Sequence, residues 1–351
     1  MKKTLLILAL VAMVFNVQAV IKVAYVTNSY GSTSTPVKTM AATATTIDND
    51  PIIQMLKNDA NLEVTVKNLT SVTATDVISD LASYDVIIVQ ESFGSAAGIL
   101  TPSGALSLKN MPKPFIYNKT YALRNGKAIT NNTAAAAAES ASLTLTVESG
   151  ALTNDLFKAC TIGTSNEIAM FNAVMMDDGT PTNTDVTKLK SLNYTTGNVL
   201  SNTSTILARP TGNTTAIICV NDIPAGTTID SETLTSRMIT FGMNFGAICG
   251  NAGKNITDDN LTMWRNAVYI LAGQAVPATK PKITTGFNQP NASTISFDGK
   301  VVRNINSEVL NVFNVTGKLI STSNKDIDMS NLAKGVYFVK GQNNTLKVSV
   351  Q

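Results

Sequence analysis

The run Tyr84-Asp85-Val86-Ile87-Ile88-Val89 decides the predicted fold of the main part of this chain. Its last four residues are all apolar and β-branched, which predicts a strand that is buried on both faces. Strands of that kind belong to parallel sheets with both faces covered. Working outward from this run, the pattern predicts four further strands, at residues 21–27, 62–66, 113–118 and 239–243.

Helical patterns lie between and after these strands. Asp50-Pro51 places a capping residue before a proline at the first helical position, and an apolar face follows at Ile52, Ile53 and Leu56. A short helix is predicted from near Thr75, with an apolar stripe at Val77, Ile78 and Leu81. The last helix begins at Thr257-Asp258-Asp259 and repeats apolar residues at Leu261, Trp264, Val268 and Leu271, so Trp264 is expected in the core.

This order of elements resembles the flavodoxin-like fold of class I glutamine amidotransferase-like proteins, and ThuA-like domains in particular. The resemblance rests on the strand 84–89, on Phe241-Gly242-Met243, and on the run from Trp264 to Gly273. It implies an α/β fold, a parallel sheet with helices on both faces. Residues 131–221 match little, and we interpret Ala134–Ala138 and the Thr-rich stretches around it as insertions or loops.

The end of the chain has a different pattern. Residues 308–315 alternate polar and apolar side chains, Gly317 lies at a predicted hairpin turn, and the strand patterns 336–339 and 346–350 are separated by turn formers. Several short strands with frequent turns predict a small all-β sandwich. By this pattern alone, the tail is a β-module of any kind, a carbohydrate-binding one included.

Three motifs in the tail are more specific. They are Asn314-Val315-Thr316-Gly317-Lys318, Ile327-Asp328-Met329-Ser330-Asn331-Leu332 and Gly335-Val336-Tyr337-Phe338-Val339-Lys340, followed by a closing strand at 347–350. In this order they resemble the type A C-terminal sorting domain of the type IX secretion system. The positions that match the family's motifs are Gly317, Lys318, Asp328, Leu332, Gly335, Val336 and Tyr337. The resemblance implies that the secretion translocon and sorting machinery are partners, and that the tail is removed during outer-membrane passage.

The beginning of the chain is consistent with export. Lys2 and Lys3 precede the apolar run 5–15, and Val17-Gln18-Ala19 has the small residues of a signal-peptide cleavage site. The expected organisation is a signal peptide at 1–19, an α/β domain at 20–274, an exposed Pro- and Lys-rich linker at 275–290 and the sorting domain at 291–351. The expected location is the cell exterior or outer surface, reached through the periplasm, with no transmembrane segment in the mature chain.

Composition excludes several functions. Removing residues 1–19 leaves 25 Lys and Arg against 24 Asp and Glu, so no global field attracts nucleic acid. The chain contains no histidine, and residues 118–121 after the fourth predicted strand contain no nucleophile elbow. Cys-His and Ser-His mechanisms and His-ligated metals are therefore excluded, and no metal or cofactor is expected. Cys160, Cys219 and Cys249 are interpreted mainly as buried free thiols, with one disulfide as the alternative.

Two loops are candidate ligand sites because they follow predicted parallel strands. The first is the hydroxyl-rich loop 27–35, with Asn28, Ser29, Tyr30, Ser32 and Thr33. It opens onto a helical pattern, which favours a Ser/Thr helix cap in a solvated loop; a contact with a sugar or another polar small molecule, or with a phosphate group, is the alternative. The second is Gln90-Glu91-Ser92-Phe93-Gly94, where Glu91 is a weak candidate acid or base and Ser92 a ligand contact; the alternative is a solvated strand end.

Other acidic residues suggest weaker sites. Asp177, Asp178, Asn183 and Asp185 lack the spacing of an EF-hand loop, which favours an acidic turn over a calcium site. Asp222, Asp230 and Glu232 are candidates for glycosidase carboxylates, but no pattern brings them together.

Two functions follow from these observations. The first is an exported, non-catalytic module that binds a glycan, another polar small molecule or a partner. The alternative is a secreted hydrolase that acts on glycans through carboxylates, with Glu91 as one of them.

Overall fold

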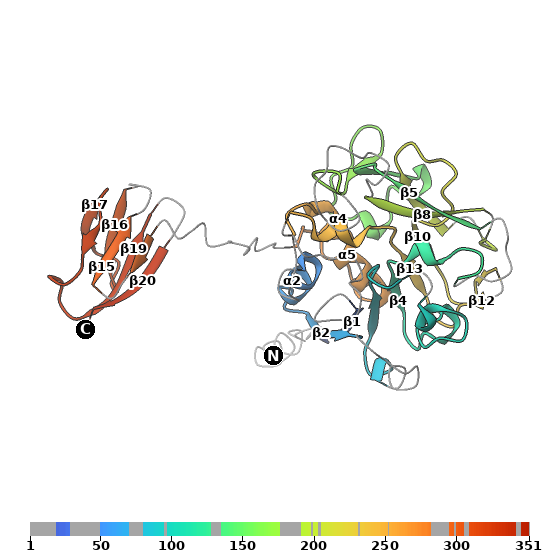
Figure 1. The fold of residues 1–351 in the computed structure, drawn as a ribbon, viewed down its shortest axis with the longest axis horizontal. Coiled ribbons are helices and arrows are strands. Elements are labelled where there is room, and N and C mark those ends of the chain that lie inside the picture. Colours follow the sequence, from blue (N-terminus) through green and yellow to red (C-terminus); the bar gives the residue numbers. More distant parts are fainter. Residues whose placement is uncertain are drawn as a thin grey trace, which may run out of the picture. The chain divides into compact units, whose positions relative to one another are not determined.

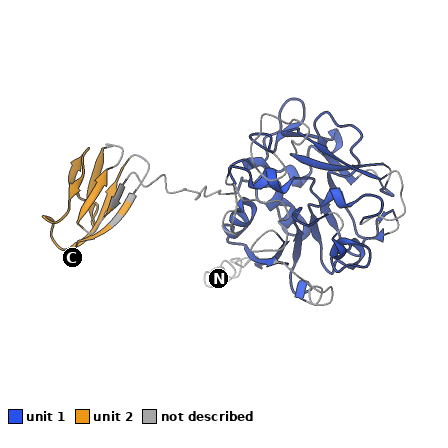
Figure 2. Ribbon diagram, viewed as in Figure 1, with its two compact units in different colours: residues 1–283 blue, residues 284–351 orange. Residues whose placement is uncertain are grey.

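The computed structural model of this chain describes residues 19–28, 50–69, 80–94, 97–127, 135–175, 191–197, 199–202, 205–230, 232–251, 253–281, 295–297, 300–304, 309–341 and 345–350. The chain forms two compact units, residues 1–283 and residues 284–351, which are coloured separately in Figure 2. The predicted signal peptide and the predicted helix near Thr75 lie outside the described residues, apart from Ala19 and Leu81.

The first unit is organised around a sheet of nine strands in the order β2-β1-β3-β4-β13-β10-β9-β6-β7 (Figure 1). The strands are β1 (Ile21–Thr27), β2 (Leu62–Asn68), β3 (Val86–Val89), β4 (Phe115–Tyr117), β6 (Thr144–Val147), β7 (Glu167–Ala169), β9 (Ile206–Pro210), β10 (Val220–Ile223) and β13 (Met238–Thr240). Strands β2, β1, β3, β4 and β13 are parallel to one another. The five strands predicted from the sequence are these five, so this part of the prediction is confirmed.

Four of the parallel strands, β1, β3, β4 and β13, contribute to two hydrophobic cores, because successive side chains point to opposite faces of the sheet. On β1, Val23 and Tyr25 belong to one core, whereas Ala24 and Val26 belong to the other. Strand β3 divides in the same way, and all four of its side chains are buried. This burial on both faces accounts for the continuous apolar run from which the strand was predicted.

The prediction that helices cover both faces of the sheet is wrong. All three α-helices of the described residues, α2 (Pro51–Lys57), α4 (Phe245–Cys249) and α5 (Asp258–Leu271), bury their apolar residues in the core that contains Tyr25. Within the described residues, the opposite core is closed by loops, by the helical residue Leu81 and by the short 3-10 turns η3 (Gly98–Leu100), η4 (Leu108–Asn110) and η5 (Thr120–Ala122). Strand makes up 36% of the structure and helix 18%, so the fold is a large mixed sheet and not a flavodoxin-like α/β fold.

The two predicted helix starts are confirmed, and each has a side-chain cap. Asp50 accepts hydrogen bonds from the N–H groups of Ile52 and Ile53, at 2.9 and 3.1 Å. Thr257 accepts one from Asn260 at 3.1 Å. Such caps satisfy backbone donors that have no partner within the helix. Trp264 is fully buried and packs edge-on against Phe241, with ring centroids 4.7 Å apart, so its predicted core role is also confirmed.

The segment interpreted as loops instead supplies much of the remaining sheet structure. Ala136–Ser140 is strand β5, which pairs antiparallel with β8 (Leu192–Thr196). Strands β6, β7, β9 and β10 extend the main sheet with antiparallel pairs, and β11 (Thr228–Ile229) pairs with β12 (Glu232–Thr233). Ala is depleted in strands, so the Ala-rich run of β5 gave little local signal and its pairing with β8 decided its structure.

The three cysteines are free, and Cys219 and Cys249 are buried, as the interpretation as buried thiols predicted. Burial raises the pKa of the Cys219 thiol to about 12. The thiol therefore behaves as a small apolar group and not as a nucleophile.

The second unit is a small β-sandwich, as predicted. One sheet contains β14 (Ile295–Phe297), β15 (Val301–Asn304) and β18 (Ile327–Asp328). The other has the order β17-β16-β19-β20, with β16 (Leu310–Asn314), β17 (Leu319–Ser323), β19 (Gly335–Lys340) and β20 (Thr345–Val350). Between them lies a separate apolar core that includes Val302, Leu310, Val312, Val339 and Val348.

The start of the predicted linker is attached to the first unit. Most of residues 275–281 are exposed, as expected, but Val276 is buried. Arg265 donates a hydrogen bond to the carbonyl oxygen of Thr279, and Lys280 pairs with Asp259 at 2.6 Å. The segment therefore belongs to the main unit as far as the described residues extend.

Candidate functional site

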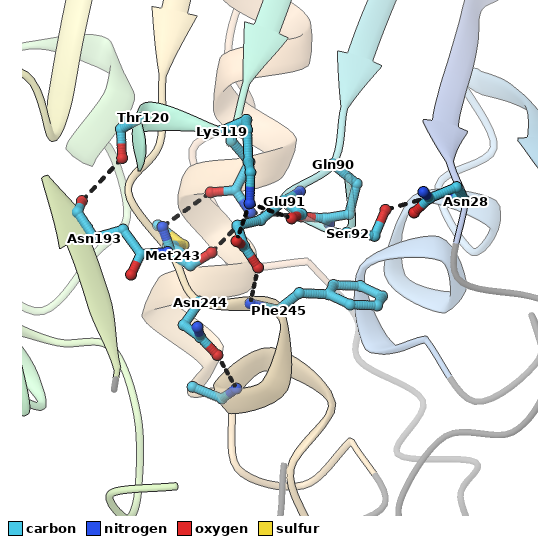
Figure 3. Close-up of polar contacts among 12 residues, drawn as sticks. Asn28, Gln90, Glu91, Ser92, Lys119, Thr120, Asn193, Met243, Asn244 and Phe245 are labelled. Atoms are coloured by element: carbon cyan, nitrogen blue, oxygen red, sulfur yellow. Dashed lines mark hydrogen bonds and ion pairs between the residues drawn. The ribbon is translucent and has the colours of Figure 1, made fainter. Parts of the chain in front are cut away.

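Buried polar side chains gather where three parallel strands end. Thr27 ends β1 and Asn28 follows it, residues 90–92 follow β3, and residues 118–120 follow β4. Because the three strands are adjacent and parallel, their carboxyl ends meet at one edge of the sheet (Figure 3). Open parallel sheets bind ligands at this edge. We call this group the polar edge.

The centre of the polar edge is a buried ion pair between Glu91 and Lys119. Lys119 Nζ lies 2.5 Å from Glu91 Oε1 and 3.0 Å from the carbonyl oxygen of Glu91, and Figure 3 shows the two side chains pointing toward each other. Glu91 Oε2 accepts a hydrogen bond from the N–H group of Phe245 at 3.2 Å. Both carboxylate oxygens thus have donors, and Glu91 is only 2% exposed, so its interpretation as a solvated strand end is wrong.

A chain of hydrogen bonds beside the ion pair joins Asn118, Gln90, Tyr25 and Asp50. Asn118 Nδ2 donates to Gln90 Oε1 at 2.5 Å, and Gln90 Nε2 donates to the hydroxyl of Tyr25 at 2.7 Å. The Tyr25 hydroxyl donates to Asp50 at 2.5 Å. Burial, and then the charge of Asp50, raise the pKa of Tyr25 well above its ordinary value. The phenol therefore stays protonated and acts as a fixed donor.

Asn118 also joins the edge to the segment after β13. Its Nδ2 donates to the carbonyl oxygen of Met243, and its Oδ1 accepts from the N–H group of the same residue, both at 2.9 Å. Asn244 follows and caps α4 by accepting from the N–H group of Ala247 at 3.2 Å. This arrangement places the N–H group of Phe245 beside Glu91.

Neutral groups make up the part of the edge nearest β1. The hydroxyls of Thr27 and Ser92 lie 2.9 Å apart, and the N–H group of Asn28 donates to Ser92 Oγ at 3.2 Å. Asn28 Oδ1 is buried and has no hydrogen-bond partner among the described residues. An acceptor that is buried without a donor is costly, so this oxygen is suited to receive a donor from a ligand.

Strand β8 closes the other side of the edge. Thr120 Oγ1 donates to the carbonyl oxygen of Asn193 at 3.0 Å, and Thr195 Oγ1 donates to the carbonyl oxygen of Thr120 at 2.6 Å. Asn193 Oδ1 is a second buried acceptor without a partner among the described residues, and Asn193 is 2% exposed.

The structure brings together three of the predicted site residues, Asn28, Glu91 and Ser92. The other four, Ser29, Tyr30, Ser32 and Thr33, lie outside the described residues. Sequence analysis missed Lys119, Asn118 and Asn193, and it named Gln90 in the second loop without giving it a role. For Asn118 and Lys119 a signal existed, because polar residues that follow a short buried strand lie at the ligand-binding edge of a parallel sheet.

The contacts described for the other candidate carboxylates, Asp222, Asp230 and Glu232, are with residues outside the polar edge. Asp222 forms a bidentate pair with Arg237, at 2.8 and 2.6 Å, and Glu232 pairs with Lys109 at 3.2 Å. Asp230 lies in a turn with φ of 53°. The candidate calcium ligands at 177–185 lie outside the described residues. Within the described part of the chain, no three His, Cys, Asp or Glu side chains are grouped as metal ligands.

The sorting-motif residues hold the tail sandwich together. Gly317 has φ of 77° in the turn between β16 and β17, and the N–H group of Lys318 donates to Asn314 Oδ1 at 2.9 Å. Asp328 accepts from the N–H group and the hydroxyl of Ser330, at 2.9 and 2.5 Å. The Tyr337 hydroxyl donates to the carbonyl oxygen of Ala333 at 2.8 Å. Leu332 packs against the tail core, while Gly335 and Val336 begin β19.

These features define a two-unit protein that ends in a separately folded β-sandwich tail. Residues 289–351 match the family model of the secretion system C-terminal sorting domain. The tail is therefore a type IX sorting domain, and the protein is exported by that system to the outer cell surface or the medium. Its sorting domain implies an interaction with the type IX machinery.

Searches of curated proteins and of solved structures gave no significant match for the chain. In the part of the chain that the structure describes, no helix has the length and apolar composition to span a bilayer.

Proposed function

We propose that the main unit is a non-catalytic binding module that holds a glycan or another polar, uncharged small molecule at the polar edge. The observation that supports this most is the buried oxygen of Asn28, which has no donor among the described residues. The backbone N–H group of the same residue donates to the hydroxyl of Ser92, which lies 2.9 Å from the hydroxyl of Thr27. Sugar hydroxyls supply donors of the kind that such oxygens require, because each hydroxyl both donates and accepts.

The alternative of a carboxylate-dependent glycan hydrolase has less support. Such an enzyme needs a carboxyl group that can exchange a proton or attack the substrate. Both oxygens of Glu91 already accept hydrogen bonds, one of them from a lysine ammonium. An ion pair of this kind fixes the orientation of the carboxylate and occupies both of its oxygens, which suits a structural role.

A glycan array followed by calorimetry tests the proposal on the purified chain that begins at residue 20. Asn28→Ala should weaken binding of any glycan found by about tenfold or more, the cost of one lost hydrogen bond to a buried group. Asn172→Ala is the matched control, since this asparagine is exposed and its side chain donates a hydrogen bond to the carbonyl oxygen of Lys254. Equal affinity in both variants would contradict the assignment of the site, and hydrolysis of the bound glycan would favour the enzyme.

A further inference from the structure

The tail exposes apolar side chains that its own fold does not use. Among the described residues, five of the six large apolar side chains that are exposed lie in the tail: Val309, Val315, Leu319, Ile320 and Phe338. Their exposed fractions run from 37% for Phe338 to 68% for Val315. Scattered exposed apolar residues are ordinary, whereas a concentration in one small unit points to an interaction surface.

Strand register arranges part of this set into a row. Phe313 on β16 lies opposite Phe338 on β19 and opposite Leu319 on β17. Residues opposite one another in adjacent antiparallel strands have side chains on the same face of the sheet. The neighbouring Val312 and Val339 point the other way, into the tail core. Leu319, Phe313 and Phe338 therefore cross three strands on the outer face, and we call them the outer row.

The charges around the outer row have one sign. Lys318 precedes Leu319, and Lys340 lies two positions after Phe338, hence on the same face. Neither lysine forms an ion pair among the described residues, and no Asp or Glu occurs at 309–325 or 335–351. Residues 284–351 contain seven Lys and Arg against four Asp and Glu, so the tail alone has a formal charge of +3.

We infer that the outer row is the surface by which the tail docks onto a protein of the type IX machinery, and that the docked surface is apolar with an acidic rim. The motif residues Gly317, Asp328 and Tyr337 already have roles inside the sandwich, in a turn and in local hydrogen bonds. The outer row has no such role, and its basic rim selects an acidic partner by charge complementarity. This inference concerns the tail, so it does not depend on ligand binding by the main unit.

Export of the full chain in a host that has the secretion system tests the inference. The double variant Leu319→Thr/Phe338→Thr should lower the exported fraction by about tenfold, the effect expected for central apolar contacts. Its melting temperature should stay within about 2 °C of the parent, because both side chains are exposed. Lys318→Gln/Lys340→Gln should lower export by a smaller factor, about threefold. Lys325→Gln/Lys334→Gln removes the same charge from outside the row and should leave export unchanged.

Crosslinking identifies the partner. A photoreactive phenylalanine analogue at position 338 should form a crosslink to a component of the machinery, identified by mass spectrometry, and the crosslink should vanish in Leu319→Thr. A crosslink only to a second copy of this chain, or only to residues of its own main unit, would overturn the inference. Unchanged export of Leu319→Thr/Phe338→Thr would overturn it as well.

Discussion

The main unit buries polar side chains, whereas the tail exposes apolar ones. At the polar edge, Glu91 and Lys119 are at most 4% exposed, and each is held by partners from adjacent strands. In the tail, Phe338 and Leu319 are 37% and 50% exposed. Burying an ion pair requires full pairing, and exposing apolar area loses hydrophobic stabilisation. The contrast indicates that the ion pair of the polar edge is satisfied by its own neighbours, whereas these apolar side chains of the tail are not covered by the tail itself.

The largest expected effect concerns the buried ion pair. Lys119→Met should lower the free energy of unfolding of the main unit by about 3–5 kcal/mol, because Glu91 remains buried without its counter-ion. Urea denaturation of the purified chain measures this. Glu91→Gln/Lys119→Met should recover most of the loss, since no charge is then left buried. If Lys119→Met were as stable as the parent, the ion pair of Glu91 and Lys119 would not be buried as described.

The second prediction concerns the tail core. Leu310→Ala should destabilise the tail by about 2–5 kcal/mol, since Leu310 is fully buried there. The transition of the main unit should not move, because residues 1–283 have their own cores. Calorimetry that resolves two transitions checks this, with exposed Val309→Ala as the neutral control. A single shifted transition would show that the two units unfold together.

Alkaline pH should affect the main unit through Cys219. Burial raises the pKa of this thiol from 9.0 to about 12 in the folded chain. Below pH 9 the thiol is protonated in both the folded and the unfolded chain, so it does not change the free energy of unfolding. Between pH 9 and 12 the unfolded chain has lost a proton that the folded chain keeps, so the free energy of unfolding falls as pH rises. The expected loss from this group is about 1 kcal/mol at pH 10. Melting curves from pH 7 to 10.5 should show a shallower decline for Cys219→Ala than for the parent.

The smallest expected effect lies in the turn between β16 and β17. Gly317→Ala should cost about 1 kcal/mol, because φ is 77° there and only glycine adopts that region freely. No atom lies within 4 Å of the added methyl group, so the cost comes from the backbone alone. Gly335→Ala is the matched control, without a positive φ and with its nearest atoms 3.9 Å away. Equal stability of Gly317→Ala and Gly335→Ala would show that the positive φ of Gly317 does not cause the loss.

The strands of the parallel half could be predicted because each is a continuous apolar run, as at 86–89, where burial on both faces leaves a strong pattern. The cover of the sheet could not be predicted correctly, because the sequence pattern suggested helices on both faces. The second core is covered by turns such as η3 and η4, and these have no periodic pattern. Strand β5, an Ala-rich run, forms through pairing with β8, more than fifty residues later in the chain.

About half of the polar-edge residues could not be predicted from the sequence either. Glu91 could be singled out because it follows a buried strand, but its meeting with Lys119 depends on β3 and β4 being adjacent and parallel. Asn193 reaches the edge from β8, which no local pattern connects to β4. Contacts between residues distant in sequence arise from strand order, which local periodicity does not encode.

The sequence by itself determined the tail: its motifs identify a sorting domain, and the match at 289–351 confirms it. Local signals were sufficient there, because each motif holds its own turn or strand end through neighbouring residues, as Asn314 does for Lys318. Only the tertiary structure decided the mixed sheet, the packing of α2, α4 and α5 into one core and the burial of Glu91 with Lys119. Those features arise from pairings across tens of residues, whose free energy is gained only when the whole sheet assembles.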